Sequence, residues 1–215
     1  MTARAPIGPK KRPRQSRSTA TFEAIVDAAA HILREGGYEA LTTNRAAERA
    51  GVSVGSLYQY FPNKEAILAE LSRRHQVELE RGMRDIIARA DAMTLAEIVT
   101  ALIEDNARAH FHDPALHKVL FEESPALGPD DWREGFAQRA VDMVKALLEQ
   151  RRAEITVTDL PLAALIVAQS VEAVIHGAAM RGDPRLTTGE ITAQTTRLVL
   201  TYLTAPAPKV ARTQR

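Results

Sequence analysis

The 215-residue sequence has no cysteine, and only 5% of its residues are aromatic. The lack of cysteine excludes a disulfide framework, a thiolate zinc site and a cysteine nucleophile, and it fits a reducing cytoplasm. Long apolar runs are missing too. The most apolar one, residues 160–168, spans nine residues, whereas a membrane helix needs about 20. We therefore expect a soluble protein with no membrane partner.

Common enzyme signatures are also missing. The sequence has no Gly-rich phosphate loop, no nucleophile elbow and no His-Glu-x-x-His pair. These absences count against a helical enzyme, so we expect no catalytic residue and no cofactor. Glu23 and Asp27 interrupt the first apolar segment, which argues against a secretory signal and leaves a transit peptide as the alternative for the N-terminus.

Net charge is only +1, but the charges are unevenly distributed. Residues 1–19 carry six basic side chains and no acidic one, whereas residues 66–204 hold 15 basic and 21 acidic residues. A basic end on an acidic body predicts that only the N-terminal part meets a polyanion. An architectural DNA-binding protein would spread its positive charge more widely. The alternative for the basic arm is a solubilising tail.

Hydrophobic periodicity predicts helices almost throughout, and no segment alternates like a strand, so the expected fold class is all-α. Gly36-Gly37 and Gly182-Asp183-Pro184 should end helices, and Thr187–Glu190 has the spacing of a capping box. The expected helices span approximately residues 18–35, 42–50, 53–60, 63–89, 95–112, 115–122, 131–153, 160–180 and 188–204.

The most informative block runs from Leu41 to Glu65. It predicts two short helices around a turn at Gly51, held together by the apolar residues Ala47, Val52, Leu57 and Phe61. The outward face of the second helix lacks long charged side chains and offers small, hydroxyl and amide groups instead. A helix that enters a major groove needs this mixture. The outward residues are Ser53, Gly55, Ser56, Tyr58, Gln59 and Tyr60.

This block resembles the DNA-binding signature of the TetR (tetracycline-repressor-like) family over residues 18–68. The resemblance is carried by Thr42, Ala47, Ala50–Ser53, Leu57-Tyr58, Tyr60-Phe61 and Lys64-Glu65. One departure is Ala46, where the family usually carries a larger aliphatic residue. The resemblance implies a three-helix helix-turn-helix domain that a long linker helix joins to a helical ligand-binding and dimerisation domain. We expect a basic disordered arm (1–17), the DNA-binding domain (18–66), the second domain (67–204) and a disordered tail (205–215).

The resemblance also implies residue roles. Hydroxyl groups at the start of the second helix, two tyrosines and a lysine would contact phosphates, and the start and outward face of the third helix would read bases. The DNA-binding candidates are Thr42, Thr43, Arg45, Ser53, Val54, Gly55, Ser56, Tyr58, Gln59, Tyr60 and Lys64. The alternatives are a core aromatic for Tyr58 and a solvated charge for Lys64.

The helices near 131–153 and 160–180 are the expected dimer interface, because the second is apolar nearly all round. The alternative is the central helix of a monomer. Polar residues interrupt the apolar helices at few places, as in a ligand pocket, although they could pair with one another or lie at the dimer seam. The candidate ligand residues are Asn106, His110, Gln169, Glu172 and His176. The alternative is a metal site formed by His110, Glu172 and His176, but we expect no metal, because the remaining histidines should form no tight cluster. These are His31, His75, His112 and His117.

Together these features predict a DNA-binding transcriptional regulator. We expect a repressor that binds a palindromic operator as a homodimer and is released by a small hydrophobic ligand. The alternative is a DNA-binding regulator or architectural protein without a sensor. The expected location is the cytoplasm, in association with the nucleoid.

Overall fold

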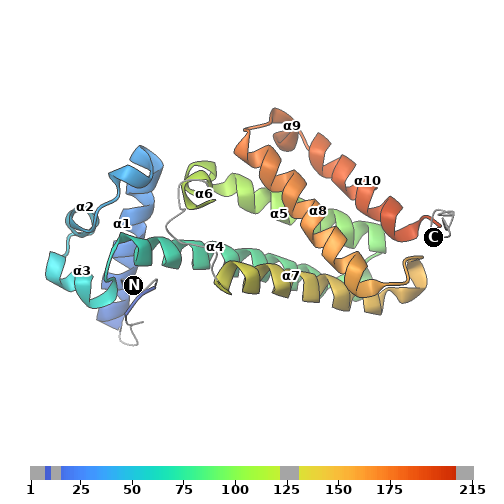
Figure 1. Cartoon of the computed structure of the whole chain (residues 1–215), viewed down its shortest axis with the longest axis horizontal. Helices are drawn as coiled ribbons and strands as arrows, with labels where there is room; N and C mark the ends of the chain where they lie inside the picture. The colour runs from blue at the N-terminus through green and yellow to red at the C-terminus, as the bar shows by residue number, and fades with distance from the viewer. Residues whose placement is uncertain (1–7, 11–15, 122–130, 207–215) are drawn as a thin grey trace, which may run out of the picture. The chain divides into compact units, whose positions relative to one another are not determined.

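A computed structural model describes residues 8–10, 16–121 and 131–206. Within these ranges the chain consists of helices and connecting turns, without a strand (Figure 1). The prediction of an all-α fold is thus confirmed. Most of the basic arm, including Arg4 and Lys11–Arg14, lies outside the described residues, as do residues 122–130 and the tail from 207 onward.

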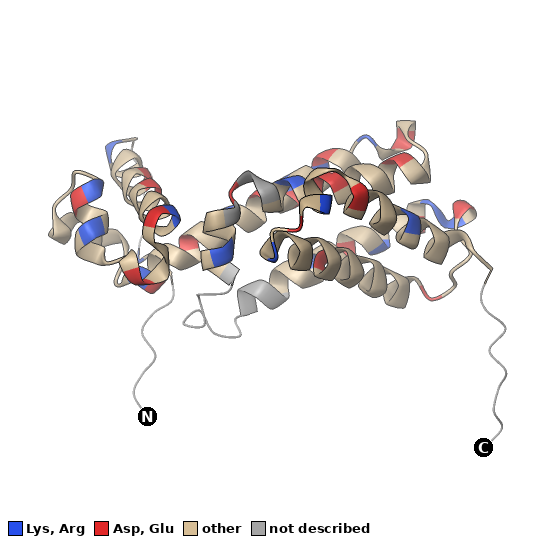
Figure 2. Ribbon diagram, turned by 90° about the horizontal axis from the view of Figure 1, so that it is seen from above, with Lys and Arg blue, Asp and Glu red and all other residues tan. Residues whose placement is uncertain are grey.

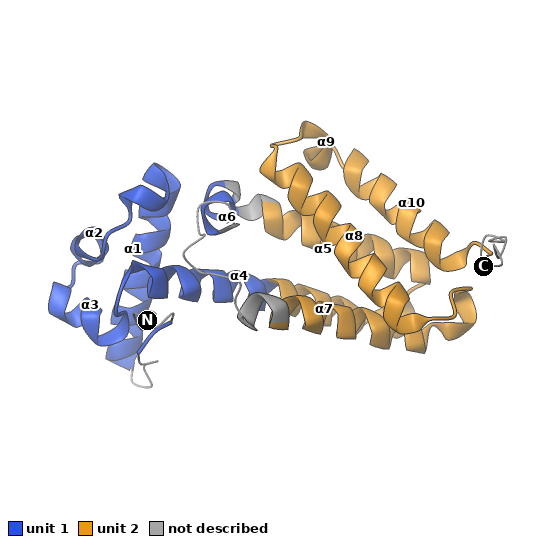
Figure 3. Ribbon diagram, in the orientation of Figure 1, with its two compact units in different colours: residues 1–78, 113–130 blue, residues 79–112, 131–215 orange. Residues whose placement is uncertain are grey.

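The chain divides into two compact units (Figure 3). Unit 1 contains residues 1–78 and 113–130, and unit 2 contains residues 79–112 and 131–215. Helix α4 (Lys64–Ile87) contributes to both, because the division falls after Glu78. The helix α6 (Pro114–Phe121) belongs with the N-terminal residues, although the sequence alone assigned it to the second domain.

Unit 1 is built on α1 (Ser16–Ala40), which packs on α2 (Thr43–Arg49), α3 (Val54–Tyr60) and α6. The inward stripe of α1 is buried, with Ile25 and Leu33 at most 1% exposed. Leu57 and Phe61 are fully buried against it, and the Phe61 ring stacks on Phe22 with centroids 4.9 Å apart. Apolar side chains at helical spacing thus lock the short helices α2 and α3 onto α1, as the sequence predicted.

Local side-chain caps fix the starts of α2 and α4. The Thr42 hydroxyl accepts a hydrogen bond from the Arg45 amide at 3.1 Å, and the Asn63 carboxamide accepts one from Ala66 at 2.8 Å. The turn between α2 and α3 places Gly51 at φ 66°, a left-handed conformation that glycine adopts without strain. The predicted helix-turn-helix is therefore present.

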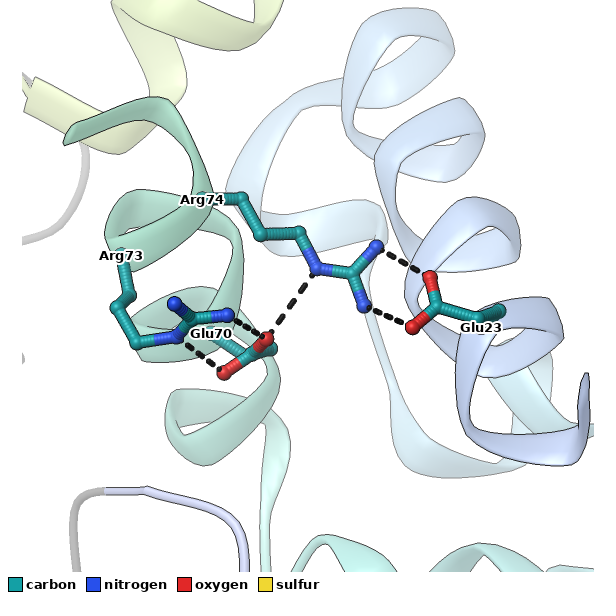
Figure 4. Close-up of polar contacts among 4 residues, drawn as sticks. All are labelled: Glu23, Glu70, Arg73 and Arg74. Atoms are coloured by element: carbon teal, nitrogen blue, oxygen red, sulfur yellow. Dashed lines mark hydrogen bonds and ion pairs between the residues drawn. The ribbon is translucent and has the colours of Figure 1, made fainter. Parts of the chain in front are cut away.

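A cluster of ion pairs joins α4 to α1 within unit 1 (Figure 4). The Glu70 carboxylate is only 2% exposed and accepts hydrogen bonds from Arg73 at 2.7 and 2.9 Å and from Arg74 at 3.2 Å. The Arg74 guanidinium also donates two hydrogen bonds, at 2.6 and 2.9 Å, to Glu23 of α1. Glu70 therefore orients the arginine that crosses between the two helices.

Unit 2 is a bundle in which α8 (Leu160–Met180) packs on α5 (Leu95–His112), α7 (Asp131–Gln150) and α10 (Glu190–Thr204). Ile103, Leu148, Ile175 and Leu203 lie in its core, each at most 2% exposed. The Asp159 carboxylate caps α8 by accepting a hydrogen bond from the Leu162 amide at 3.0 Å. Short 3₁₀ turns cover residues 90–92 and 152–154.

The connection from α8 to α10 differs from the sequence prediction. Asp183 caps an additional short helix, α9 (Pro184–Thr187), by accepting a hydrogen bond from the Arg185 amide at 3.0 Å. The predicted capping box is wrong, because α10 begins after Gly189, which has no side chain to cap it. The Thr187 hydroxyl instead donates to the Pro184 carbonyl at 2.6 Å.

Helix α8 is unusually apolar over its whole length. Its most apolar 18-residue window has a mean hydropathy of 1.6, enough by length and composition to cross a membrane, and 22% of that window is buried. Its longest uninterrupted apolar run, residues 160–168, is too short to reveal this feature. Glu172 is its one acidic residue. Figure 2 marks the acidic and basic residues along the helices. Leu162, Leu165, Ile166 and Val174 remain 38–49% exposed, so part of the helix surface is left uncovered.

Candidate nucleic-acid interface

The outer face of α3 exposes most of the side chains that the sequence assigned to DNA. Ser53, Gly55 and Gln59 are exposed, as are Val54 (39%) and Tyr58 (42%). The Ser53 hydroxyl caps α3 by accepting a hydrogen bond from the Ser56 amide at 3.1 Å, and the two hydroxyl groups are 2.8 Å apart. The candidates for reading bases therefore lie on α3, and one of them, Ser53, stabilises the first turn of this helix.

The phosphate-binding candidates of α2 and α3 lie together. The Thr43 and Tyr58 hydroxyl groups are 3.2 Å apart and share a hydrogen bond. Arg45 is exposed, but its guanidinium donates to the Ala40 carbonyl at 2.9 Å, so a DNA contact would require it to leave this partner. Thr42 is exposed as well. A polyanion could reach all four side chains.

Tyr60 does not point outward as predicted. Its side chain is 7% exposed, and its ring packs edge-on against Phe22 with centroids 5.8 Å apart. The predicted orientation is wrong because Tyr60 lies three positions after the buried Leu57 and therefore shares its helix face. The Tyr60 side chain therefore does not belong to the exposed face of α3.

Lys64, the first residue of α4, has an aromatic partner that the sequence reasoning missed. Its ammonium lies 3.7 Å from the ring centroid of Tyr38. The Tyr38 hydroxyl donates to Glu65 Oε1 at 3.3 Å. Burial, followed by the charge and the hydrogen bond of Glu65, raises the pKa of this hydroxyl above its usual value of 10.0. The tyrosine thus remains protonated and acts as a donor.

The described end of the basic arm contacts the last turn of α3. The Lys10 amide donates to the Tyr60 carbonyl at 2.7 Å, and the Lys10 ammonium donates to the Tyr58 carbonyl at 3.2 Å. Carbonyls at a helix C-terminus have no partner within the helix and form the negative end of its dipole. A lysine is therefore well placed there, and it holds the start of the basic segment beside α3.

In unit 2 the structure brings together four of the five predicted ligand residues. Asn106 Nδ2 donates to Glu172 Oε2 at 3.3 Å, and His110 Nε2 lies 3.6 Å from Glu172 Oε1. His110 Nδ1 is 2.8 Å from the Asn106 carbonyl, and the His110 ring is edge-on to His176 at 5.7 Å. Gln169 lies on an exposed part of α8 and does not join this cluster.

His110 and Glu172 each stabilise the charged form of the other. Burial acts to lower the pKa of His110, but the hydrogen bond and charge of Glu172 outweigh it and raise that pKa above 6.5. Burial likewise acts to raise the pKa of Glu172, but His110 and Asn106 bring it below 4.5. An ion pair between an imidazolium and a carboxylate is thus favoured, which agrees with the alternative that these residues pair with one another.

Comparison with known proteins decides the family. The profile described as "Tetracyclin repressor-like, C-terminal domain" matches residues 94–203, more than half of the chain, and "Bacterial regulatory proteins, tetR family" matches residues 25–71. The chain belongs to the TetR family. The resemblance drawn from residues 41–65 is thereby confirmed, and the second match extends it over unit 2.

Named relatives are similar over part of their length. The repressor KstR of Rhodococcus jostii is 46% identical over 96 residues, 45% of this chain and 43% of that protein. The "Fatty acid metabolism regulator protein" of Bacillus subtilis is 38% identical over 72 residues, 33% of this chain and 37% of that protein. The chain therefore matches less than half the length of these two relatives.

Solved structures share the fold over most of the chain. A complex of SmeT with triclosan has a TM-score of 0.61 and 23% identity, covering 91% of this chain and 99% of that one. At this identity the likeness concerns the fold alone. It confirms an N-terminal helix-turn-helix followed by a helical domain.

Proposed function

We propose that this TetR-family protein is a transcriptional repressor that places α3 in the major groove of a palindromic operator. The exposed face of α3 carries this proposal. Ser53, Val54, Gly55 and Gln59 face solvent, while Leu57 on the opposite side is fully buried. A rigidly packed helix that presents small and polar groups fits direct readout of bases. The name of KstR, a transcriptional repressor, supports the direction of regulation.

Within this interface we divide the residues by task. Ser53, Val54, Gly55, Ser56 and Gln59 contact bases or the adjacent backbone. Hydroxyl groups beside α3, together with basic side chains at the starts of α2 and α4, contact phosphates. These contacts position the protein on the duplex but carry no sequence information. The proposed phosphate ligands are Thr42, Thr43, Arg45, Tyr58 and Lys64. The basic arm beyond Lys10 adds phosphate or minor-groove contacts.

The protein acts as a homodimer in this proposal, and the second copy covers the exposed apolar face of unit 2. Leu162, Leu165 and Val174 of α8 are exposed, and Leu198 of α10 is 55% exposed. A groove of about 340 Å³ between α8, α9 and α10 continues this face past Val174 and Leu198. The sequence favoured the pair at 131–153 and 160–180, but the exposed apolar residues point to α8 with α10. A second copy suits an apolar helix better than a membrane does here, because the polar cluster at Glu172 sits on the same helix.

The second domain serves as the sensor for a small, mostly apolar molecule that lowers operator affinity. The match of residues 94–203 to the C-terminal domain profile favours this over a regulator without a sensor. SmeT, which shares the fold, was solved in complex with triclosan. We take triclosan as an example of the small, mostly apolar molecules that this domain would bind. Asn106, His110, Glu172 and His176 would supply the polar contacts, with part of their network opening to admit the ligand. We propose a cytoplasmic, nucleoid-associated location and no catalytic role.

The test begins with selection of duplexes from a random-sequence pool by the full-length protein, followed by fluorescence anisotropy. We expect an inverted repeat whose half-sites lie about 34–36 Å apart or a multiple of this, bound by a dimer in sedimentation. Gln59→Ala should change the preferred base pairs, and Gln138→Ala, an exposed glutamine of α7, is the control. A monomer that binds one half-site with full affinity would contradict the proposed dimer. So would a protein that stays in solution only when detergent is added, because a membrane would then be the better partner for α8.

The sensor is tested separately. Apolar metabolites and drugs are screened by thermal shift, and each hit is added to the complex with the selected duplex. A coupling of about 1–3 kcal/mol lowers affinity 5- to 150-fold. Hits should bind less well to His176→Ala, which should still bind DNA. If bound compounds leave DNA affinity unchanged, the sensor fails while the DNA-binding role stands.

A further inference from the structure

Lys64 occupies an electrostatically unfavourable position. It is the first residue of α4, directly after the cap Asn63, and a cation there opposes the positive end of the helix dipole. A lysine side chain also has many rotamers, which it must give up to bind a phosphate. Something must therefore hold the ammonium in place if this residue is to contribute well to binding.

Tyr38 provides that support. Its ring centroid lies 3.7 Å from Lys64 Nζ, well within the range in which a ring face attracts a cation. The chain reaches this position through Gly37, whose φ of 68° and ψ of −170° break the helical run of α1. This backbone conformation suits glycine. The end of α1 thus turns to present Tyr38 to the start of α4.

The Tyr38 hydroxyl binds the carboxylate of Glu65. It donates to Glu65 Oε1 at 3.3 Å, and Glu65 is the carboxylate next to Lys64 in sequence. Without this bond, Glu65 could pair with the ammonium or repel an approaching phosphate. One tyrosine therefore attracts the cation with its ring face and binds the anion with its hydroxyl.

We infer that Tyr38 is a positioning residue for DNA binding, which orders the Lys64 ammonium for a backbone phosphate. The inference rests on the proposed function, in which Lys64 is a phosphate ligand. Pre-ordering reduces the rotamer entropy lost on binding, so it increases affinity without adding a contact. Tyr38 lies outside the residues that the sequence or the family resemblance assigned to DNA.

The experiment measures binding of the full-length protein to the selected duplex over a series of salt concentrations. Lys64→Ala should weaken binding and reduce the salt slope by about 0.9, the value for one phosphate. Tyr38→Leu should weaken binding about two- to fivefold, as expected for an exposed cation–π contact. Tyr38→Phe keeps the ring face but releases Glu65, so it should weaken binding measurably but less than Tyr38→Leu does. Lys145→Ala, on α7, is the control for loss of a positive charge.

Two further readouts separate positioning from a structural effect. In the Lys64→Ala background, Tyr38→Leu should cause no additional loss. By NMR, the Lys64 Hε protons should show an upfield ring-current shift that Tyr38→Phe keeps and Tyr38→Leu abolishes. If Lys64→Ala binds like the wild type, the phosphate role of Lys64 fails. If Lys64→Ala weakens binding while Tyr38→Leu does not, or if Tyr38→Leu is equally harmful in both backgrounds, the positioning role alone is overturned.

Discussion

Removing the buried carboxylate of Glu70 should destabilise unit 1 far more than removing Glu23, its exposed counterpart in the same ion-pair cluster. Glu70 is 2% exposed and accepts three hydrogen bonds from two arginines. Loss of one partner of a buried ion pair costs about 3–5 kcal/mol. Arg73 and Arg74 are 39% and 29% exposed, so water can rehydrate them partly. We expect Glu70→Ala to cost about 2–4 kcal/mol after this discount.

Glu23 binds Arg74 with good geometry, but its side chain is 45% exposed. An exposed pair of this kind contributes about 0.2–1 kcal/mol, so Glu23→Ala should cost no more than that. A double-mutant cycle with Arg74→Ala isolates the pair. The total effect of Arg74→Ala should be intermediate, because the guanidinium also contacts Glu70 and lies 5.8 Å from the Phe22 ring centroid.

The measurement is urea unfolding of the full chain by circular dichroism, with hydrogen exchange of peptides from α1 and α4 to assign the loss to unit 1. Glu78→Ala, an exposed acid on the same helix, is the matched control and should be nearly neutral. Equal costs for Glu70→Ala and Glu23→Ala would refute the reasoning, since burial would then not decide the contribution of each carboxylate.

Two other perturbations test unit 2 and the basic arm. The His110–Glu172 pair should stabilise the fold most between about pH 4.5 and 6.5, the ordinary pKa values of the two groups. The contribution of His110 is lost as pH rises through its raised folded-state pKa, and that of Glu172 is lost as pH falls through its lowered one. Thermal unfolding of Glu172→Gln across this range should therefore show a flatter pH profile than the wild type, and parallel profiles would contradict the pairing. Deleting residues 1–14, which removes the Lys10 contacts but leaves α1 intact, should preserve helicity and weaken DNA binding most at low salt. Unchanged low-salt affinity would reduce the arm to a solubilising tail.

Features set by neighbouring residues could be predicted from the sequence. The caps at Ser53, Asn63 and Asp159 depend on amides three positions ahead, so residue type and spacing suffice. The capping box failed because Thr187 ends a short helix, α9, that no pattern indicated. Tyr60 was predicted to face outward like its neighbours Tyr58 and Gln59, but it lies three positions after Leu57 and shares the buried face of the helix.

Contacts between distant segments could not be predicted. Tyr38 and Glu65 are 27 positions apart, and Lys10 and Tyr58 are 48 apart, so only the folded chain reveals them. The cluster formed by the ligand candidates could be predicted only in part, because it too joins distant segments. A common helix face linked Glu172 and His176, but their meeting with Asn106 and His110 required the packing of α5 on α8.

The recognition helix depends on its surroundings for its position. With seven residues, α3 is too short to be stable alone, so separate contacts must fix its start, its end and its inner face. Ser53 holds the first turn, Lys10 binds the last carbonyls, and Leu57 and Tyr60 are buried beneath. In the proposed complex, the orientation of Gln59 toward a base would therefore depend on residues that need not touch DNA. Substitutions at Lys10 or Phe22 should accordingly alter base preference as well as affinity, whereas substitution of a pure phosphate ligand should alter affinity alone.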